Sequence, residues 1–250
     1  MNYKVVVEYD GTLYHGWQVQ RGVLTIQGRM EDALGRILRR PTRVHGAGRT
    51  DAGVHAVGQV AHFFADWPHS AADLQRACNA LLPPDITITS LQPNDDDFHA
   101  RFSAKSKTYM YTILNKPLRS PLGRLYSWHV PQPLDIKGLN DAADHLKGSH
   151  DFAAFGSPTD GTSSTVREIF EAAWSEGVPP GILQFTIRGT GFLRYMVRSL
   201  VGTLVLVGRA KISPDDFHGI LISCDRSKSG PTAPARGLCL HSVDYEARWE

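Results

Sequence analysis

The pattern of hydrophobic and polar residues along the chain predicts alternating strands and helices. Runs with period two predict strands, and apolar residues spaced three and four apart predict helices. Over the first hundred residues the expected strands cover 3–10, 43–47, 54–65 and 86–91, and the expected helices cover 25–40 and 70–82. Thr25 and Ser70 are suitable N-caps, and prolines at 41 and 83 would end the two helices. The resulting order is β-α-β-β-α-β.

The second half repeats this order with one additional helix. Strands are expected at 107–115, 166–175, 182–188 and 238–245, and helices at 134–146, 192–207 and 214–222. The helix at 192–207 is apolar on most sides and should be buried. This repeated order is typical of the split-βαβ arrangement. We therefore expect an α+β protein with two related halves, residues 1–104 and 105–250, whose mostly antiparallel sheets join into one central sheet.

Composition places the chain among folded globular proteins and excludes several classes. Of its 250 residues 42% are hydrophobic and 21% are charged, which is too apolar for a disordered chain. No apolar run approaches the roughly 20 residues of a membrane span, and the N-terminus lacks a signal-peptide pattern. The three cysteines form no CxxC pair, so we expect reduced thiols in the cytoplasm. Phosphate-loop, dinucleotide and HExxH motifs are absent, so neither a cofactor nor a metal is expected.

The formal net charge of +2 hides an uneven distribution. Residues 21–50 carry seven arginines against Glu31 and Asp32, a local net charge of +5. Nineteen of the 27 basic residues are arginines, whose planar guanidinium suits bidentate contact with phosphate. A nucleic-acid partner is therefore compatible with the modest total charge.

A glycine-rich turn at 46–56 presents Arg49, Thr50 and Asp51 between two expected strands. Glycine lets the backbone adopt tight or positive-φ conformations there. One interpretation is a structural turn in which Asp51 bonds to nearby backbone. The other is a functional turn that presents a carboxylate.

Two further stretches combine basic and aromatic residues. Residues 97–111 interleave them, as is typical of a surface that stacks bases and neutralises phosphates, although Tyr109 and Tyr111 also fit the core face of a strand. In the apolar helix, Arg194 and Arg198 lie four residues apart on one face. A buried guanidinium requires an anionic partner, for which Asp51 is a candidate. The alternative is that both arginines extend to solvent.

These stretches together resemble the bacterial tRNA pseudouridine synthase A family. The matching residues run in family order over nearly the whole chain: Tyr9-Asp10-Gly11 with Gly16-Trp17-Gln18-Val19-Gln20, then Gly48-Arg49-Thr50-Asp51-Ala52-Gly53-Val54-His55-Ala56, then Asp97-Phe98-His99-Ala100-Arg101-Phe102-Ser103-Ala104 with Tyr109 and Tyr111, then Thr165-Val166-Arg167-Glu168-Ile169, and finally Phe192-Leu193 with Met196-Val197-Arg198. Two departures are Lys105-Ser106-Lys107-Thr108, where many members have arginines, and Arg194, where relatives differ.

The resemblance implies an isomerase that converts uridine to pseudouridine at positions 38, 39 and 40 of the tRNA anticodon arm. It further implies a cytoplasmic homodimer that needs no cofactor or metal, with a basic active-site cleft between two RNA-recognition-like halves.

The resemblance also implies roles for individual residues. Asp51 would be the nucleophile; attack on C1′, attack on the base and proton abstraction from C2′ remain alternatives for its action. Tyr109 would stack on the flipped uracil and assist proton removal, and Arg198 would pair with Asp51. Arg49 would fill the space that the base leaves or hold the displaced phosphate. The basic side chains of Arg101, Lys105 and Lys107 would bind the substrate.

Two other function classes remain open on residue types alone. A non-catalytic RNA-binding module of the same fold would need no carboxylate at the glycine-rich turn. A base-removing glycosidase would normally use two carboxylates, and the motifs contain only Asp51.

Overall fold

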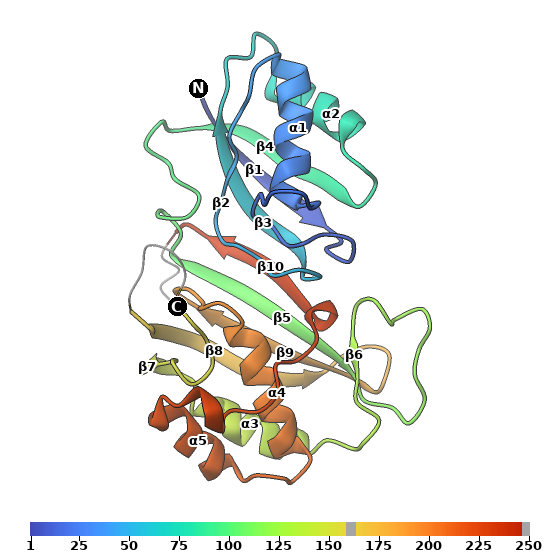
Figure 1. The fold of residues 1–250 in the computed structure, drawn as a ribbon, viewed down its shortest axis with the longest axis vertical. Helices are drawn as coiled ribbons and strands as arrows, with labels where there is room; N and C mark the ends of the chain where they lie inside the picture. The colour runs from blue at the N-terminus through green and yellow to red at the C-terminus, as the bar shows by residue number, and fades with distance from the viewer. Residues whose placement is uncertain (159–163, 247–250) are drawn as a thin grey trace. The chain divides into compact units, whose positions relative to one another are not determined.

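The computed structural model describes residues 1–158 and 164–246, which form two compact units. The first unit comprises Met1–Lys105 and the segment that begins at Cys239, and the second comprises Ser106–Leu238. Both are α+β with mostly antiparallel sheets, which confirms this part of the predicted fold class (Figure 1). No helix in the described ranges is long and apolar enough to cross a membrane.

The first unit follows the predicted β-α-β-β-α-β order. Its elements are β1 (Asn2–Tyr9), α1 (Ile26–Leu38), β2 (His45–Gly46), β3 (His55–Phe64), α2 (Ala71–Leu81) and β4 (Ile86–Asn94). The last strand of the chain, β10 (Leu238–Asp244), completes the strand order β4-β1-β3-β10. Strand β2 pairs with β3, and α2 packs against β4 while α1 contacts α2.

The predicted helix caps form in this unit. The Thr25 side chain accepts a hydrogen bond from the backbone N–H of Gly28, and Ser70 forms a capping box with Asp73. Helix α1 ends at Leu38, before the expected residue 40, because Arg39 adopts a left-handed conformation with φ 53°. Strand β4 runs on through Pro93, which an edge strand tolerates because its outer N–H groups need no partner.

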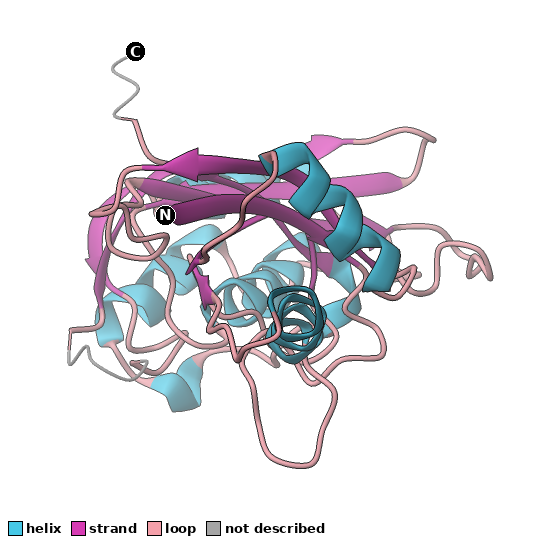
Figure 2. Ribbon diagram, turned by 90° about the horizontal axis from the view of Figure 1, so that it is seen from above, coloured by secondary structure: helices cyan, strands magenta, loops and turns pink. Residues whose placement is uncertain are grey.

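The second unit contains the helices and strands that were predicted between residues 107 and 222, together with two short strands. Its elements are β5 (Ser106–Leu114), β6 (Trp128–His129), α3 (Ile136–Asp144), β7 (Gly148–Asp151), β8 (Val166–Glu176), β9 (Ile182–Gly189), α4 (Met196–Gly208), α5 (Pro214–Ser223) and the 3₁₀ turns Arg226–Lys228 and Ala235–Gly237. The strand order is β5-β9-β8-β7, with β6 parallel to β5. Figure 2, with helices in cyan and strands in magenta, shows that both kinds of element build the protein.

Helix α4 is almost entirely buried, as predicted, but it begins later than expected. The expected start was residue 192, whereas the helix starts at Met196. Arg194 instead exchanges two backbone hydrogen bonds with Ser157, and Tyr195 is left-handed with φ 64°. The prediction that Arg194 and Arg198 share one helical face is therefore wrong, since Arg194 precedes the helix.

The closing strand β10 was expected in the second half, and it pairs with the first unit. Cys239 and Leu240 lie parallel to His55 and Ala56 of β3. A Cβ on Gly58 of β3 would lie 2.1 Å from the His241 carbonyl oxygen, so glycine permits this close approach. The expected boundary after residue 104 lies one residue from the observed start of the second unit.

Candidate active site

Asp51 lies in the turn that leads from β2 into β3. The turn is closed by a hydrogen bond of 3.1 Å from the Val54 N–H to the Asp51 carbonyl oxygen, and Gly53 has φ 78°. Thr50 is buried and Asp51 is half-buried. The candidate carboxylate therefore projects from a tightly folded turn.

The segment after β1 holds this turn in place. The backbone N–H of Trp17 donates to the Thr50 carbonyl oxygen at 3.1 Å, and the backbone N–H of Gly53 donates to the Tyr14 carbonyl oxygen at 3.2 Å. The Tyr9 and Thr50 hydroxyls form a buried hydrogen bond of 2.8 Å. Burial raises the pKa of the Tyr9 phenol well above its usual value, so it stays protonated. The motif around Tyr9 and Trp17 is thus the scaffold of the Asp51 turn, a role the sequence pattern did not reveal.

Glycines allow the segments around Asp51 to approach closely. An ideal Cβ on Gly16 would lie 2.4 Å from the Thr50 carbonyl oxygen, and one on Gly11 would lie 2.0 Å from that of Val54. A Cβ on Gly46 would lie 2.6 Å from the Trp17 indole. A side chain at these positions would displace the turn or its support.

Arg49 is exposed beside the same turn. Its Nε donates to the Gln18 side-chain oxygen at 3.1 Å. The neighbouring Gly48 carbonyl oxygen accepts a 2.8 Å hydrogen bond from the amide of Gln59, a side chain on β3 that is fully buried. The backbone on both sides of Arg49 is therefore fixed while its guanidinium lies at the surface.

Tyr109 lies on β5 in the second unit, opposite Ile187 of β9. It is 7% exposed, and the Phe192 ring meets it edge-on at a centroid distance of 5.1 Å. Tyr111, two residues on, is fully buried and donates its hydroxyl hydrogen to the Pro234 carbonyl oxygen at 2.7 Å. Tyr111 is therefore part of the core, whereas Tyr109 keeps slight access to solvent.

Arg198 lies in the first turn of α4 and is half-buried. Its Nε donates to the Ala233 carbonyl oxygen at 2.8 Å, and the Ala233 N–H donates to the Arg198 carbonyl oxygen at 3.0 Å. The guanidinium lies 5.5 Å from the Tyr195 ring centroid. Arg194 is exposed and donates to the Tyr195 hydroxyl at 2.9 Å. Tyr195 and Ala233 therefore orient Arg198, and neither was a candidate from the sequence.

The remaining basic candidates occupy less enclosed positions. The Arg101 guanidinium lies 5.5 Å from the centroid of the largely exposed Phe102 ring. Lys105 is exposed, and its backbone N–H donates to the Asp244 carbonyl oxygen at 2.8 Å. Lys107 is half-buried near the start of β5.

The seven candidates thus fall into two groups. Asp51, Arg49, Arg101 and Lys105 belong to the first unit, where Asp51 and Arg49 share one turn. Tyr109, Arg198 and Lys107 belong to the second unit. Within the two described ranges, no cluster of three His, Cys, Asp or Glu side chains is placed to hold a metal ion.

Comparison with known proteins assigns the family. A family described as tRNA pseudouridine synthase matches residues 5–103 and 142–246. The chain is 46% identical to "tRNA pseudouridine synthase A" of Geotalea uraniireducens, covering 97% of this chain and 98% of that protein. It is 42% identical to the protein of the same name from Thermoanaerobacter sp., covering 98% and 99%, and 44% identical to that from Syntrophotalea carbinolica, covering 97% and 95%. The chain therefore belongs to the tRNA pseudouridine synthase A family.

Proposed function

We propose that this protein isomerises uridine to pseudouridine at positions 38, 39 and 40 of the tRNA anticodon arm. Membership of the family makes it an isomerase that acts on tRNA. The observation that carries the proposal is the Asp51 turn: Asp51 is half-buried, and Tyr9, Tyr14 and Trp17 hold the Thr50 and Gly53 positions on either side of it.

The reaction rearranges bonds within one nucleotide. The bond from ribose C1′ to uracil N1 breaks, the base turns, and C1′ joins C5. The proton on C5 is then lost and N1 gains one, so no group is imported and nothing is oxidised. Such a reaction needs a carboxylate as nucleophile or cation stabiliser and an acceptor for the C5 proton.

Asp51 is the proposed nucleophile, and Tyr109 and Arg198 act on the same uridine. Tyr109 stacks on the uracil after the base has been extruded from the RNA, and it assists removal of the C5 proton. Arg198 pairs with Asp51 and keeps the carboxylate ionised, because a nearby cation lowers a carboxyl pKa. The bond from Arg198 Nε to the Ala233 carbonyl oxygen supports a directed role for the guanidinium. A double-mutant cycle on Asp51 and Arg198 measures their coupling.

The basic side chains are proposed to hold the RNA. Arg49 fills the space that the extruded base leaves, and Arg101, Lys105 and Lys107 contact the phosphates. Binding of this kind weakens as salt rises, because cations are released from the RNA when the protein binds. Affinity for tRNA that does not change with salt would count against these contacts.

We also propose the family's architecture and assembly for this chain. Both units derive from one split-βαβ pattern, supported by the complete β-α-β-β-α-β order of the first unit and the partial order of the second. A central sheet and a basic active-site cleft accompany this pattern, and the protein works as a cytoplasmic homodimer. Sedimentation equilibrium tests the assembly, and a purely monomeric enzyme with full activity would exclude a required dimer.

Nucleoside analysis after incubation with a tRNA that has uridine at 38–40 tests the proposed activity. Pseudouridine at those positions supports the isomerase, an abasic site indicates a glycosidase, and unchanged RNA indicates a binding module.

Replacement of Arg198 tests its role in the same assay. Arg198→Lys keeps the charge but loses the Nε donor to Ala233, so we expect a marked fall in kcat. Arg36→Lys is the matched control, because Arg36 is exposed on α1 of the first unit. Equal activity of the two variants would remove Arg198 from the catalytic group.

A further inference from the structure

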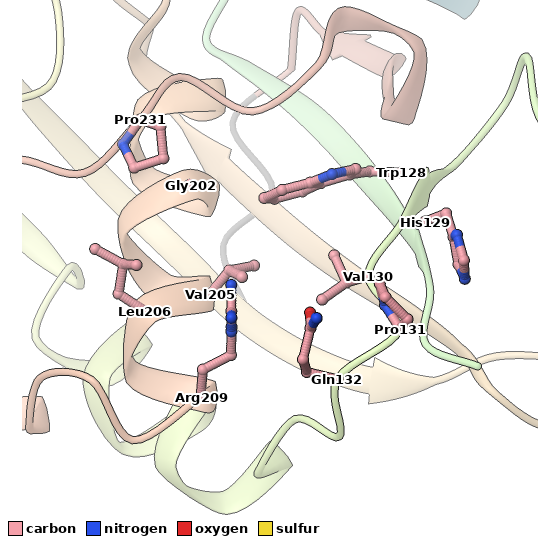
Figure 3. A pocket seen from close by; sticks show the side chains of 10 residues that line it. All are labelled: Trp128, His129, Val130, Pro131, Gln132, Gly202, Val205, Leu206, Arg209 and Pro231. Carbon is pink, nitrogen blue, oxygen red and sulfur yellow. The ribbon is translucent and has the colours of Figure 1, made fainter. Parts of the chain in front are cut away.

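A cavity of about 180 Å³ lies within the second unit, beside α4 (Figure 3). The strand β6 and the residues after it form one wall, α4 forms another, and Pro231 closes one end. Figure 3 shows the Trp128 indole reaching across the cavity toward Gly202, while the side chains of Gln132 and Arg209 lie at the opposite end. The residues that carry the family resemblance include none of these four.

Two polar side chains of this cavity are available for a ligand. Within residues 1–158 and 164–246, neither the Arg209 guanidinium nor the Gln132 amide has a hydrogen-bond or ion-pair partner. His129 differs, because its Nε2 forms a 2.8 Å hydrogen bond with the Lys116 carbonyl oxygen and its ring turns away from the cavity (Figure 3).

The cavity lies on the same face of α4 as Arg198. Residues 198, 202, 205 and 209 are spaced by four, three and four, which places them along one side of a helix. At a rise of 1.5 Å per residue, Arg209 is about 16 Å from Arg198 along the axis.

Close packing gives the cavity its shape. A Cβ on Gly202 would lie 1.7 Å from the Pro231 carbonyl oxygen, so only glycine lets this segment lie against α4. The buried Tyr111 ring meets Trp128 nearly perpendicularly at a centroid distance of 6.4 Å, which orients the indole. The apolar sides come from Val130, Val205 and Leu206.

These features fit one nucleobase. The cavity is smaller than the roughly 300–1,000 Å³ of sites for drug-sized ligands, so it suits a fragment. An indole is a sequence-tolerant stacking surface for bases, and Gln and Arg side chains bond to base edges. Arg209 follows the C-terminal end of α4, where the helix dipole is negative and disfavours a free phosphate.

We propose that the cavity formed by Trp128, Gln132, Gly202 and Arg209 binds one unstacked base of the bound tRNA, other than the uridine that is isomerised. The identity of the RNA rests on the proposed function, whereas base binding by the cavity does not. The site adds affinity for substrate and takes no part in the chemical step.

Substitutions at the cavity test its role in RNA binding. Trp128→Leu and Arg209→Ala should each raise the Kd and KM for tRNA, the former by about 5- to 100-fold, with kcat retained. Trp128→Phe keeps an aromatic surface and should lose less affinity for tRNA than Trp128→Leu. Lys211→Ala is the matched control for Arg209→Ala, since it removes the same charge from an exposed position two residues away. Thermal unfolding of each variant identifies a loss of folding. If folded Arg209→Ala binds tRNA as tightly as Lys211→Ala, and folded Trp128→Leu binds it as tightly as wild type, the proposal is overturned.

A second measurement does not depend on isomerase activity. Uridine and adenosine monophosphates are titrated into the whole protein while NMR follows the Trp128 indole, assigned with Trp128→Phe. We expect both to shift that signal, and inorganic phosphate and ribose 5-phosphate to leave it in place. Equal shifts with inorganic phosphate would make this an anion site and contradict the proposal. If the protein binds the bases but forms no pseudouridine, the base-binding site in the cavity is supported and the proposed function is rejected.

Discussion

Gly16→Ala tests whether the turn that presents Asp51 must be fixed to within about an ångström. Gly16 has φ 87°, and an ideal Cβ on it would lie 2.4 Å from the Thr50 carbonyl oxygen and 3.1 Å from the Asp51 carbonyl carbon. The added methyl group therefore pushes directly on the backbone of the turn.

The size of the effect follows from these distances. Ordinary contact begins at 3.4 Å, so the turn or the Gly16 segment must shift by about 1 Å. A 1 Å displacement of a reacting group costs roughly 10²-fold in rate. The left-handed conformation adds about 1–2 kcal/mol of strain for a residue with a side chain. We therefore expect kcat to fall by about 100-fold and the free energy of unfolding to fall by about 1–3 kcal/mol.

Gly22→Ala supplies the matched control. Gly22 also has a positive φ of 79°, but nothing lies within 4 Å of its ideal Cβ. It should carry the backbone strain without moving the Asp51 turn. Single-turnover pseudouridine formation and urea unfolding are measured for both variants. Equal activity of Gly16→Ala and Gly22→Ala would refute the claim that the position of this turn limits catalysis.

Three further predictions concern the scaffold. Tyr111→Phe removes the buried hydroxyl that bonds to Pro234, so urea unfolding should show a loss of about 1–2 kcal/mol; an unchanged midpoint would mean that this bond adds nothing. Ser213→Ala breaks the capping box of α5 and should cost about 1 kcal/mol in unfolding free energy with kcat unchanged, so a selective loss of activity would contradict a purely structural role. Burial and the neighbouring His99 and His45 lower the pKa of His62 to about 4, so the unfolded chain binds more protons than the folded one between pH 6.5 and 4. The free energy of unfolding should therefore fall as the pH drops through that range. His62→Gln should make this pH dependence weaker, and an unchanged dependence would mean that another group causes it.

The sequence predicted local structure well where short-range interactions decide it. The N-caps Thr25 and Ser70 both accept the expected backbone hydrogen bonds, because a cap and its partner lie within three residues. The start of α4 was missed because Arg194 pairs with Ser157, 37 residues earlier, and no local pattern encodes that bridge. Strands β6 and β7, with two and four residues, are too short to show a period.

The same contrast between short-range and long-range interactions applies to the candidate site. The turn of Asp51 stood out because its glycines and charged residues are contiguous. Its support did not, because the bond between Tyr9 and Thr50 joins residues 41 positions apart. The cavity beside α4 was hidden for the same reason, since Trp128 and Arg209 are brought together only by the folded chain.

The most direct test of the account is pseudouridine formation by Asp51→Ala, measured by nucleoside analysis of tRNA with uridine at 38–40 together with the Kd for that tRNA. We predict no pseudouridine even at long incubation, with tRNA affinity within a few-fold of wild type, because Asp51 supplies the chemistry and the basic residues supply the binding. Substantial pseudouridine formation by a folded, tRNA-binding Asp51→Ala would contradict the central claim.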